Sequence, residues 1–242
     1  MLSLPEGISA LLFDLDGVLT QTSKVHAKAW AQMFDEVLAA RGQPPFDPVH
    51  DYAEFVDGKP RLDGVRSFRA SRSIELPEGG PEDPASAETV HGLGRRKNDL
   101  VLRAIHEDGV EPYEGSVRFA RAARDAGVPM AVVSASANAK DVLAAAGLAD
   151  LADTVVDGHA VEDEGLNGKP APDTVLVGAR RLGVEPGQAA VFEDALAGVE
   201  AGRAGRFGWV VGVDRIGQAD ALAAHGADVV VKDLSELLGG AA

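Results

Sequence analysis

Short apolar runs alternate with segments of helical periodicity over most of this chain. Six runs predict strands, at residues 8–13, 130–133, 154–156, 189–192, 209–213 and 229–231. The segments between them predict helices at 117–126, 140–146, 172–182, 196–201 and 218–224. Strands that alternate with helices are typical of βαβ units. The pattern therefore predicts an α/β fold with a Rossmann-like parallel sheet core.

The alternation stops between the first two predicted strands. Here the periodicity predicts helices alone, at 26–41, 52–55, 63–71 and 95–107. We interpret residues 22–107 as a helical cap domain inserted after the first strand, and residues 1–21 and 108–242 as the α/β core domain. The Pro- and Gly-rich stretch 77–84 predicts an exposed, mobile loop, and 239–242 predicts a frayed end.

Composition and charge exclude several classes of partner. The chain has 242 residues, of which 45% are hydrophobic, and a formal net charge of −15. Such an acidic surface repels phosphate backbones and anionic membranes, so we expect no nucleic-acid and no membrane partner. The absence of cysteine excludes disulfides, thiolate nucleophiles and Cys-based zinc sites. With no signal-like start and no apolar stretch of membrane-spanning length, we expect a cytoplasmic protein.

An acidic pair, Asp14 and Asp16, ends the first predicted strand. Carboxylates at the end of a buried strand persist when a metal ion or a basic side chain neutralises them. Ligands of open α/β sheets bind at the carboxyl ends of the strands. Gly17 would let the backbone turn sharply and approach the ligand closely. The alternative is an acidic pair that only caps a turn.

Three other segments near predicted strand ends carry polar groups: 134–138, Lys169-Pro170 and Glu193-Asp194. Each has a simpler explanation: a serine can cap a helix, a Lys-Pro step can form a turn, and an acidic pair can complement a helix dipole. In a parallel sheet, however, all of them would meet Asp14 and Asp16 at one edge. We interpret their joint occurrence as a single pocket.

The residue types in this pocket suit phosphoryl transfer. Asp14, Glu193, Asp194 and the main-chain carbonyl of Asp16 could hold Mg²⁺, which prefers oxygen ligands. Asp14 could attack phosphorus and form an aspartyl phosphate. Ser134 and Lys169 would stabilise the charged phosphoryl oxygens. Asp16 lies on the same side of an extended chain as Asp14 and could transfer the proton of the substrate oxygen.

These motifs, in this order, resemble the four motifs of the haloacid dehalogenase superfamily. The resemblance implies Asp14 as nucleophile, Asp16 as acid/base, and Ser134 and Lys169 as phosphate ligands. It also implies that Asp14, Asp16, Glu193 and Asp194 hold Mg²⁺, and that the insertion is a type-1 helical cap.

Within the superfamily, residues 11–214 resemble the β-phosphoglucomutase family. The similarity is carried by Asp14 to Trp30, by Gly58 to Arg61, by Arg95 to Asp99 and by the segment 134–138. It implies a set of substrate-binding residues: Thr22, His26, Trp30, Arg61, Lys97, Asn98, Ser136 and Asn138. The chain departs from the family at 73–91 and at Lys59, both in the cap. From the residues alone, Arg61 could be solvated, His26 could be a packing residue and Trp30 could be cap core.

The resemblance implies a mutase that converts β-glucose 1-phosphate to glucose 6-phosphate through a phosphorylated Asp14. A sugar-phosphate phosphatase is the alternative, because the same core residues would serve with water as acceptor. A third possibility is a sugar-phosphate-binding protein with an inactive site, although no catalytic motif is broken. The expected partner is a small sugar phosphate, and we expect a monomer.

Overall fold

The chain, described for residues 2–239 by a computed structural model, divides into two compact units. The core unit comprises Met1–Gln21 and Val110–Ala242, and the inserted unit comprises Thr22–Gly109. Residues 240–242, most of the expected frayed end, lie outside the described residues. No helix in the described part of the chain is both long enough and apolar enough to cross a membrane.

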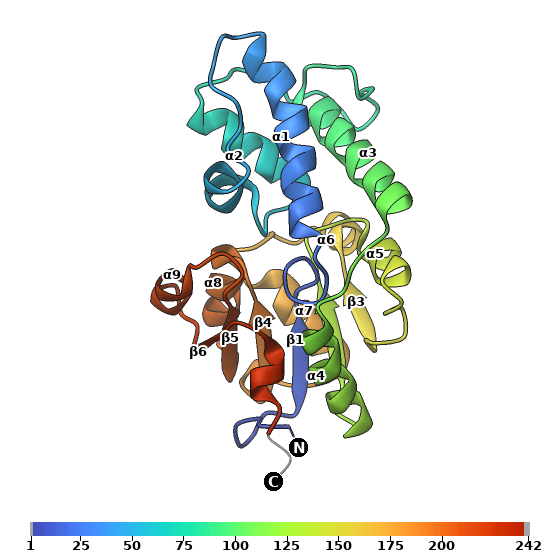
Figure 1. Cartoon of the computed structure of the whole chain (residues 1–242), viewed down its shortest axis with the longest axis vertical. Helices are drawn as coiled ribbons and strands as arrows, with labels where there is room; N and C mark the ends of the chain where they lie inside the picture. The colour runs from blue at the N-terminus through green and yellow to red at the C-terminus, as the bar shows by residue number, and fades with distance from the viewer. Residues whose placement is uncertain (1, 240–242) are drawn as a thin grey trace. The chain divides into compact units, whose positions relative to one another are not determined.

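The core unit contains a six-stranded sheet in the order β3-β2-β1-β4-β5-β6 (Figure 1). Its strands are β1 (Ala10–Phe13), β2 (Met130–Val133), β3 (Thr154–Val156), β4 (Ala189–Glu193), β5 (Trp209–Val213) and β6 (Val229–Val231). Every neighbouring pair is parallel. The chain builds outward from β1 to β3 and then returns to the other side of β1, so the strand order reverses at β1. Such a reversal is where open α/β sheets bind ligands. The predicted parallel α/β core is confirmed.

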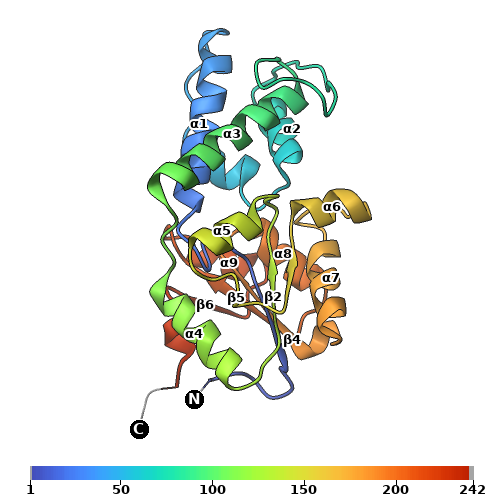
Figure 2. The same ribbon diagram turned by 90° about the vertical axis from the view of Figure 1, so that its right-hand side faces the viewer.

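Helices cover both faces of this sheet. They are α4 (Glu114–Asp125), α5 (Ala139–Ala145), α6 (Gly158–Glu164), α7 (Asp173–Leu182), α8 (Leu196–Ala204) and α9 (Ala219–Ala224), with 3₁₀ turns η2 (Pro186–Gln188) and η3 (Leu234–Leu237). Figure 2 shows α4 and α7 on opposite sides of the sheet. The sequence pattern missed α6, because Val161 is its only buried residue and leaves no apolar stripe to detect. Instead, the side chain of Asp157 caps the helix by accepting from the backbone N–H of Ala160 at 3.1 Å.

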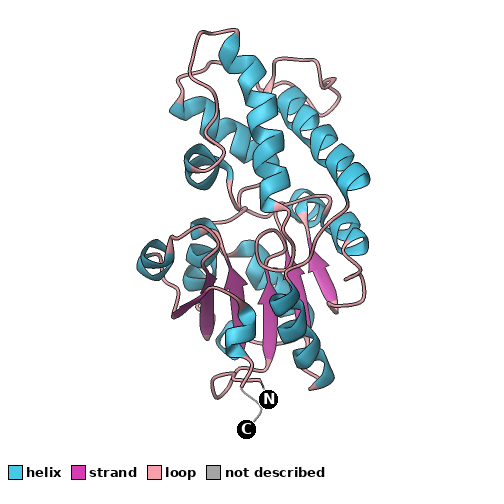
Figure 3. Cartoon of the chain, in the orientation of Figure 1, coloured by secondary structure: helices cyan, strands magenta, loops and turns pink. Residues whose placement is uncertain are grey.

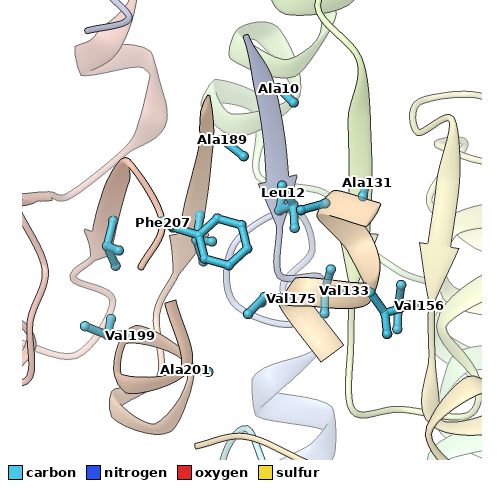
Figure 4. Close-up of a cluster of buried hydrophobic side chains, with 14 of the residues drawn as sticks. Ala10, Leu12, Ala131, Val133, Val156, Val175, Ala189, Val199, Ala201 and Phe207 are labelled. Atoms are coloured by element: carbon cyan, nitrogen blue, oxygen red, sulfur yellow. The ribbon is translucent and has the colours of Figure 1, made fainter. Parts of the chain in front are cut away.

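Alternate residues of the strands pack on opposite faces, which explains why their sequences are apolar throughout. Ala10 and Leu12 of β1 belong to the cluster that includes residues of α7 and α8 (Figure 4). Phe13, on the other face, stacks on Phe192 with ring centroids 4.7 Å apart and meets Phe119 of α4 edge-on at 6.2 Å. The strand ends that follow are therefore anchored on both sides.

The described residues of the inserted unit form helices and loops but no strand (Figure 3). The helices are α1 (Ser23–Ala39), the π-helix η1 (Tyr52–Val56), α2 (Arg61–Ser71) and α3 (Val90–Asp108). They enclose a hydrophobic cluster of their own, in which Phe34 contacts Trp30 and Phe68 at centroid distances of 5.4 and 4.2 Å. The helix α3 begins five residues earlier than the predicted residue 95, because Thr89 Oγ1 accepts from the Gly92 N–H at 2.9 Å and caps it.

The Pro- and Gly-rich loop before α3 is mostly exposed, as predicted. Side chains of the neighbouring helices bind the residues on either side of it. Arg69 donates to the carbonyl of Leu76 at 3.2 Å, and Arg96 donates to that of Ala85 at 2.7 Å. The mobility of this loop stays a prediction.

Candidate active site

The parallel register brings the acidic segments to the same level of the sheet. Phe13 of β1 pairs with Phe192 of β4 on one side and with Val132 of β2 on the other. Asp14 and Glu193, each the next residue, therefore leave the sheet edge together. The backbone N–H of Asp14 donates to the carbonyl of Phe192 at 2.9 Å, which continues the ladder to the first carboxylate.

Lys169 connects these two carboxylates. Its Nζ lies 2.6 Å from Asp14 Oδ1 and also hydrogen-bonds Glu193 Oε1, and it donates to the carbonyl of Val133 at 3.2 Å. The side chain is 2% exposed, so these ion pairs are shielded from water. It comes from the loop before α7, whose Lys169-Pro170 peptide bond is cis. The predicted meeting of these strand ends is thus present in the structure.

Three buried carboxylates, those of Asp14, Glu193 and Asp194, have oxygen atoms within 4.8 Å of one another. One lysine does not balance three negative charges, and buried like charges are costly without a compensating cation. An all-oxygen donor set of this kind fits a hard divalent cation such as Mg²⁺. The Asp16 carboxylate is not part of this group, and its Oδ2 accepts from the hydroxyl of Ser134 at 3.3 Å.

Two glycines permit this crowding of acidic groups. A Cβ on Gly17, whose φ is +94°, would lie 1.8 Å from Asp194 Oδ2. A Cβ on Gly198 would lie 2.0 Å from Glu193 Oε1. The sequence pattern points to Gly17 as a tight turn, whereas nothing in it singles out Gly198. Both positions exclude any side chain, because the backbone itself touches the carboxylates.

The segment after β2 is a network of serine hydroxyls. Ser134 Oγ accepts from the Ser136 N–H at 3.1 Å, and Ser136 Oγ accepts from the Asn138 N–H at 3.2 Å. Asn138, not Ser134, precedes α5 as its N-cap residue. The explanation of Ser134 as a helix cap is therefore wrong, and its hydroxyl is turned toward Asp16 instead.

Burial and charge shift the pKa values of the ion pair. Burial raises the pKa of Asp14 to about 6 from an ordinary 3.8, against the opposing effect of Lys169. Burial alone would lower the pKa of Lys169, but the charges of Asp14 and Glu193 more than offset it and raise the pKa above its ordinary value. Lys169 is therefore a fixed positive charge at neutral pH, while Asp14 remains titratable.

The predicted substrate-binding residues of the inserted unit form two contacts. In the first, Lys97 Nζ lies 2.9 Å from His26 Nδ1 and 4.9 Å from the centroid of the Trp30 ring. Because a lysine ammonium can only donate, His26 Nδ1 is the acceptor. Burial, followed by the charges of Lys97 and Arg61, holds the pKa of His26 well below its usual range, so the ring is neutral.

In the second contact, Arg61 Nη1 donates to Asn98 Oδ1 at 2.5 Å. Thr22 is buried directly before α1, where its carbonyl accepts from the His26 N–H at 2.8 Å. Trp30 is only 3% exposed and belongs to the hydrophobic cluster of the unit, so its packing role is established. Lys59, where the chain departs from the family, donates to the carbonyl of Phe55 at 3.0 Å and so stabilises the end of η1.

The segment after β5 makes two contacts at or beside the acidic group that the sequence did not predict. Arg215 Nε donates to the carbonyl of Gly17 at 2.7 Å, and Gln218 Nε2 donates to that of Asp194 at 2.9 Å. Only the position of these two residues in the sequence could have pointed to them, because they follow a predicted strand whose carboxyl end lies at the same edge of the sheet.

Comparison with known proteins agrees with this geometry. A family model described as haloacid dehalogenase-like hydrolase matches residues 8–206. The chain is 55% identical to a β-phosphoglucomutase of Mycobacterium bovis, with 98% of this chain and 94% of the relative covered. It is 36% identical to a fructose-1-phosphate phosphatase of Escherichia coli, with 82% and 93% covered. The crystal structure of β-phosphoglucomutase from Clostridium difficile superposes with a TM-score of 0.76 at 25% identity, covering 95% of this chain and 93% of that one.

Proposed function

The chain belongs to the haloacid dehalogenase-like hydrolase family and is an enzyme, and from this premise we propose that it is a β-phosphoglucomutase. It would convert β-glucose 1-phosphate to glucose 6-phosphate by passing a phosphoryl group through Asp14. The observation that carries the proposal is the buried Asp14 carboxylate, held 2.6 Å from Lys169 beside Glu193 and Asp194. The relative that is 55% identical over nearly the whole chain supports the choice of reaction.

In this proposal Asp14 is the nucleophile, and Lys169 orients it through the ion pair. With a pKa of about 6, Asp14 is mostly ionised at neutral pH and can attack phosphorus. Lys169 and the Ser134 hydroxyl then stabilise the oxygens of the transferred group. Asp16, which accepts from Ser134 at 3.3 Å, donates and accepts the proton of the sugar oxygen in the two half-reactions.

Magnesium would complete this charge balance. We assign its ligands to Asp14, Asp16, Glu193 and Asp194, and the bound ion would neutralise charge on the phosphoryl oxygens. The Asp16 ligand would be its main-chain carbonyl, because its carboxylate binds Ser134.

We assign substrate binding in the inserted unit to two cationic groups. Arg61 can bind a phosphate with two parallel hydrogen bonds, and Lys97 adds a second charge. Asn98 already accepts from Arg61 and would orient that guanidinium toward a ligand. Thr22, His26 and Trp30 from the inserted unit, with Ser136 and Asn138 from the core unit, complete the proposed set.

A sugar-phosphate phosphatase is the second candidate. The E. coli relative at 36% identity, a fructose-1-phosphate phosphatase, favours it. The same core groups would serve, with water in place of the sugar as phosphoryl acceptor.

Phosphorus NMR distinguishes the two reactions. The protein is mixed with β-glucose 1-phosphate, Mg²⁺ and a catalytic amount of glucose 1,6-bisphosphate, and α-glucose 1-phosphate serves as control substrate. The mutase predicts that the glucose 6-phosphate signal grows only with the β anomer. Steady release of inorganic phosphate without an isomerised product would reject the mutase and support the phosphatase. The monomeric state and the cytoplasmic location stay predictions.

A further inference from the structure

The segment that follows β5 contacts the backbone directly after the first acidic motif and the backbone of the last one, although it contributes no carboxylate to either. Arg215 and Gln218 lie three positions apart on this segment, which leads from β5 to α9 (Figure 1). Arg215 donates to the carbonyl of Gly17, directly after the first acidic motif, and Gln218 donates to the carbonyl of Asp194 in the last one. One short segment therefore holds the backbone of two motifs that are far apart in the sequence.

Arg215 is held by several contacts, although it lies outside the predicted site. Besides Gly17, its guanidinium donates to the carbonyl of Lys232 at 2.9 Å and to Ser116 Oγ at 3.3 Å. It also lies over the ring of Tyr113, with 3.6 Å between Cζ and the ring centroid. The side chain is 13% exposed. A guanidinium fixed on several sides is a rigid point of attachment for the turn at Gly17.

The segment itself is held in shape by Asp214. Its Oδ1 accepts from the N–H groups of Gly217 and Gln218 at 2.7 and 2.8 Å. This side-chain-to-backbone turn fixes the direction in which Gln218 leaves the segment. The spacing between the two attachment points is thereby set by local geometry.

The first and last acidic motifs are in contact where Arg215 and Gln218 bind them, between Gly17 and Asp194. A Cβ on Gly17 would lie 1.8 Å from Asp194 Oδ2, so any shift of the Gly17 backbone changes the room left for that carboxylate. Asp194 is one of the three carboxylates whose oxygens lie within 4.8 Å of one another. A displacement of either backbone would change the spacing of this oxygen set, and Mg²⁺ tolerates little departure from its preferred geometry.

We propose that Arg215 and Gln218 are positioning residues that fix the spacing of the Asp14, Glu193 and Asp194 carboxylates and so set the affinity of the site for a divalent cation. They act through backbone carbonyls and touch neither the substrate nor the reacting atoms. This inference rests on the metal site in the proposed function but not on the choice between mutase and phosphatase.

Calorimetric titration with Mn²⁺ in the absence of substrate tests the inference. The variants are Arg215→Lys, which keeps the charge but loses the planar fork, and Gln218→Met, which keeps the length but loses the donor. We expect each to weaken the Mn²⁺ Kd on the order of 10-fold, as is typical when groups behind metal ligands are altered. Raising the Mg²⁺ concentration should restore much of the turnover that each variant loses.

The matched control is Arg181→Lys, which removes an arginine contact to the carbonyl of Val155 at 2.8 Å, on the far strand β3 of the same unit. It should leave the Mn²⁺ Kd unchanged, and near-ultraviolet circular dichroism confirms that each variant is folded. A wild-type Kd in both folded test variants, or an equal loss in the control, would overturn the inference. If the wild-type protein itself binds no Mn²⁺, the inference and the metal site are both wrong. If it binds Mn²⁺ and the variants weaken that binding but no mutase activity is found, only the proposed reaction is wrong.

Discussion

Replacing Asp14 with Asn should abolish turnover and yet stabilise the metal-free protein at neutral pH. The carboxylate is 8% exposed, and burial raises its pKa from 3.8 to about 6. At about 1.4 kcal/mol per pH unit, that difference corresponds to about 3 kcal/mol. Asparagine has the same shape and can still accept from Lys169, but it never carries the charge.

The sign follows from proton linkage. Below pH 3.8 the carboxyl is protonated in both the native and the unfolded state, so it carries no penalty there. As the pH rises from 3.8 to about 6, the native state keeps the Asp14 proton that the unfolded state has already lost, so the free energy of unfolding falls over this range. Above that range the full cost of about 3 kcal/mol is present, so the advantage of Asp14→Asn should grow with pH and then level off. In excess Mg²⁺ the advantage should shrink, because the bound ion stabilises the carboxylate.

The assay is thermal unfolding of both proteins in chelator at pH 4.5 and at pH 8. For a chain of this length, about 3 kcal/mol corresponds to a rise in Tm of about 6 to 12 °C at pH 8, with a smaller difference at pH 4.5. The exposed Asp125, at the end of α4, provides the control variant Asp125→Asn, for which no such growth is expected. If Asp14→Asn is no more stable than the wild type at pH 8 in chelator, the cost of burying this charge has been misjudged.

Three further predictions test other parts of the molecule. Lys169→Met leaves two buried carboxylates, Asp14 and Glu193, without their ion-pair partner. Urea unfolding in chelator should show that the free energy of unfolding falls by about 3 to 5 kcal/mol, and a fall below about 1 kcal/mol would contradict the ion-pair argument. His26 has a lowered pKa, so the unfolded state binds its proton first as the pH falls below 6.5; the Tm of the wild type should therefore fall with acidification more steeply than that of His26→Asn, and parallel curves would count against a buried neutral ring. Gly158→Ala places a Cβ 2.7 Å from the N atom of Ala137 and 3.0 Å from the O atom of Ala135, in the segment 134–138. Because a small displacement of substrate-binding groups slows a reaction strongly, kcat/KM should fall about 10-fold or more. Gly187→Ala, with open space around the added Cβ, should leave kcat/KM unchanged.

The strand ends that meet at the site could be predicted from the sequence, because parallel pairing fixes the level at which neighbouring strands end. Once β1 and β4 are neighbours, the carboxylates of Asp14 and Glu193 must leave the sheet at the same level. Apolar runs predict buried strands reliably. Lys169 could be assigned to the site because the loops that follow parallel strands all lie at the same edge of the sheet. The helix α6 escaped detection because it is held by a cap and a single buried valine rather than by an apolar stripe.

Contacts to backbone carbonyls were beyond the reach of sequence reasoning. The sequence shows that Arg215 follows a strand but not that the Gly17 carbonyl points at it, since that direction depends on the turn around Gly17. The same holds for Gly198, whose importance appears only once the Glu193 carboxylate is seen against it. In the inserted unit, the residue types of Lys97 and His26 gave no sign that they are 2.9 Å apart, because helices α1 and α3 pack in ways that periodicity alone does not fix.

The first and last acidic motifs behave as one structural element, although most of the chain separates them. Gly17 excludes any side chain because Asp194 occupies the space, and Asp194 is held from behind by Gln218. The turn at Gly17 is held in turn by Arg215 from the same segment. If Arg215 and Gln218 act as proposed, we expect a substitution at any of these four positions to displace a carboxylate oxygen, even where it removes no carboxylate. If the four residues form one arrangement, variants at these positions should all weaken metal binding without a change in Tm. Four independent packing contacts would instead change Tm and leave the metal affinity as it is.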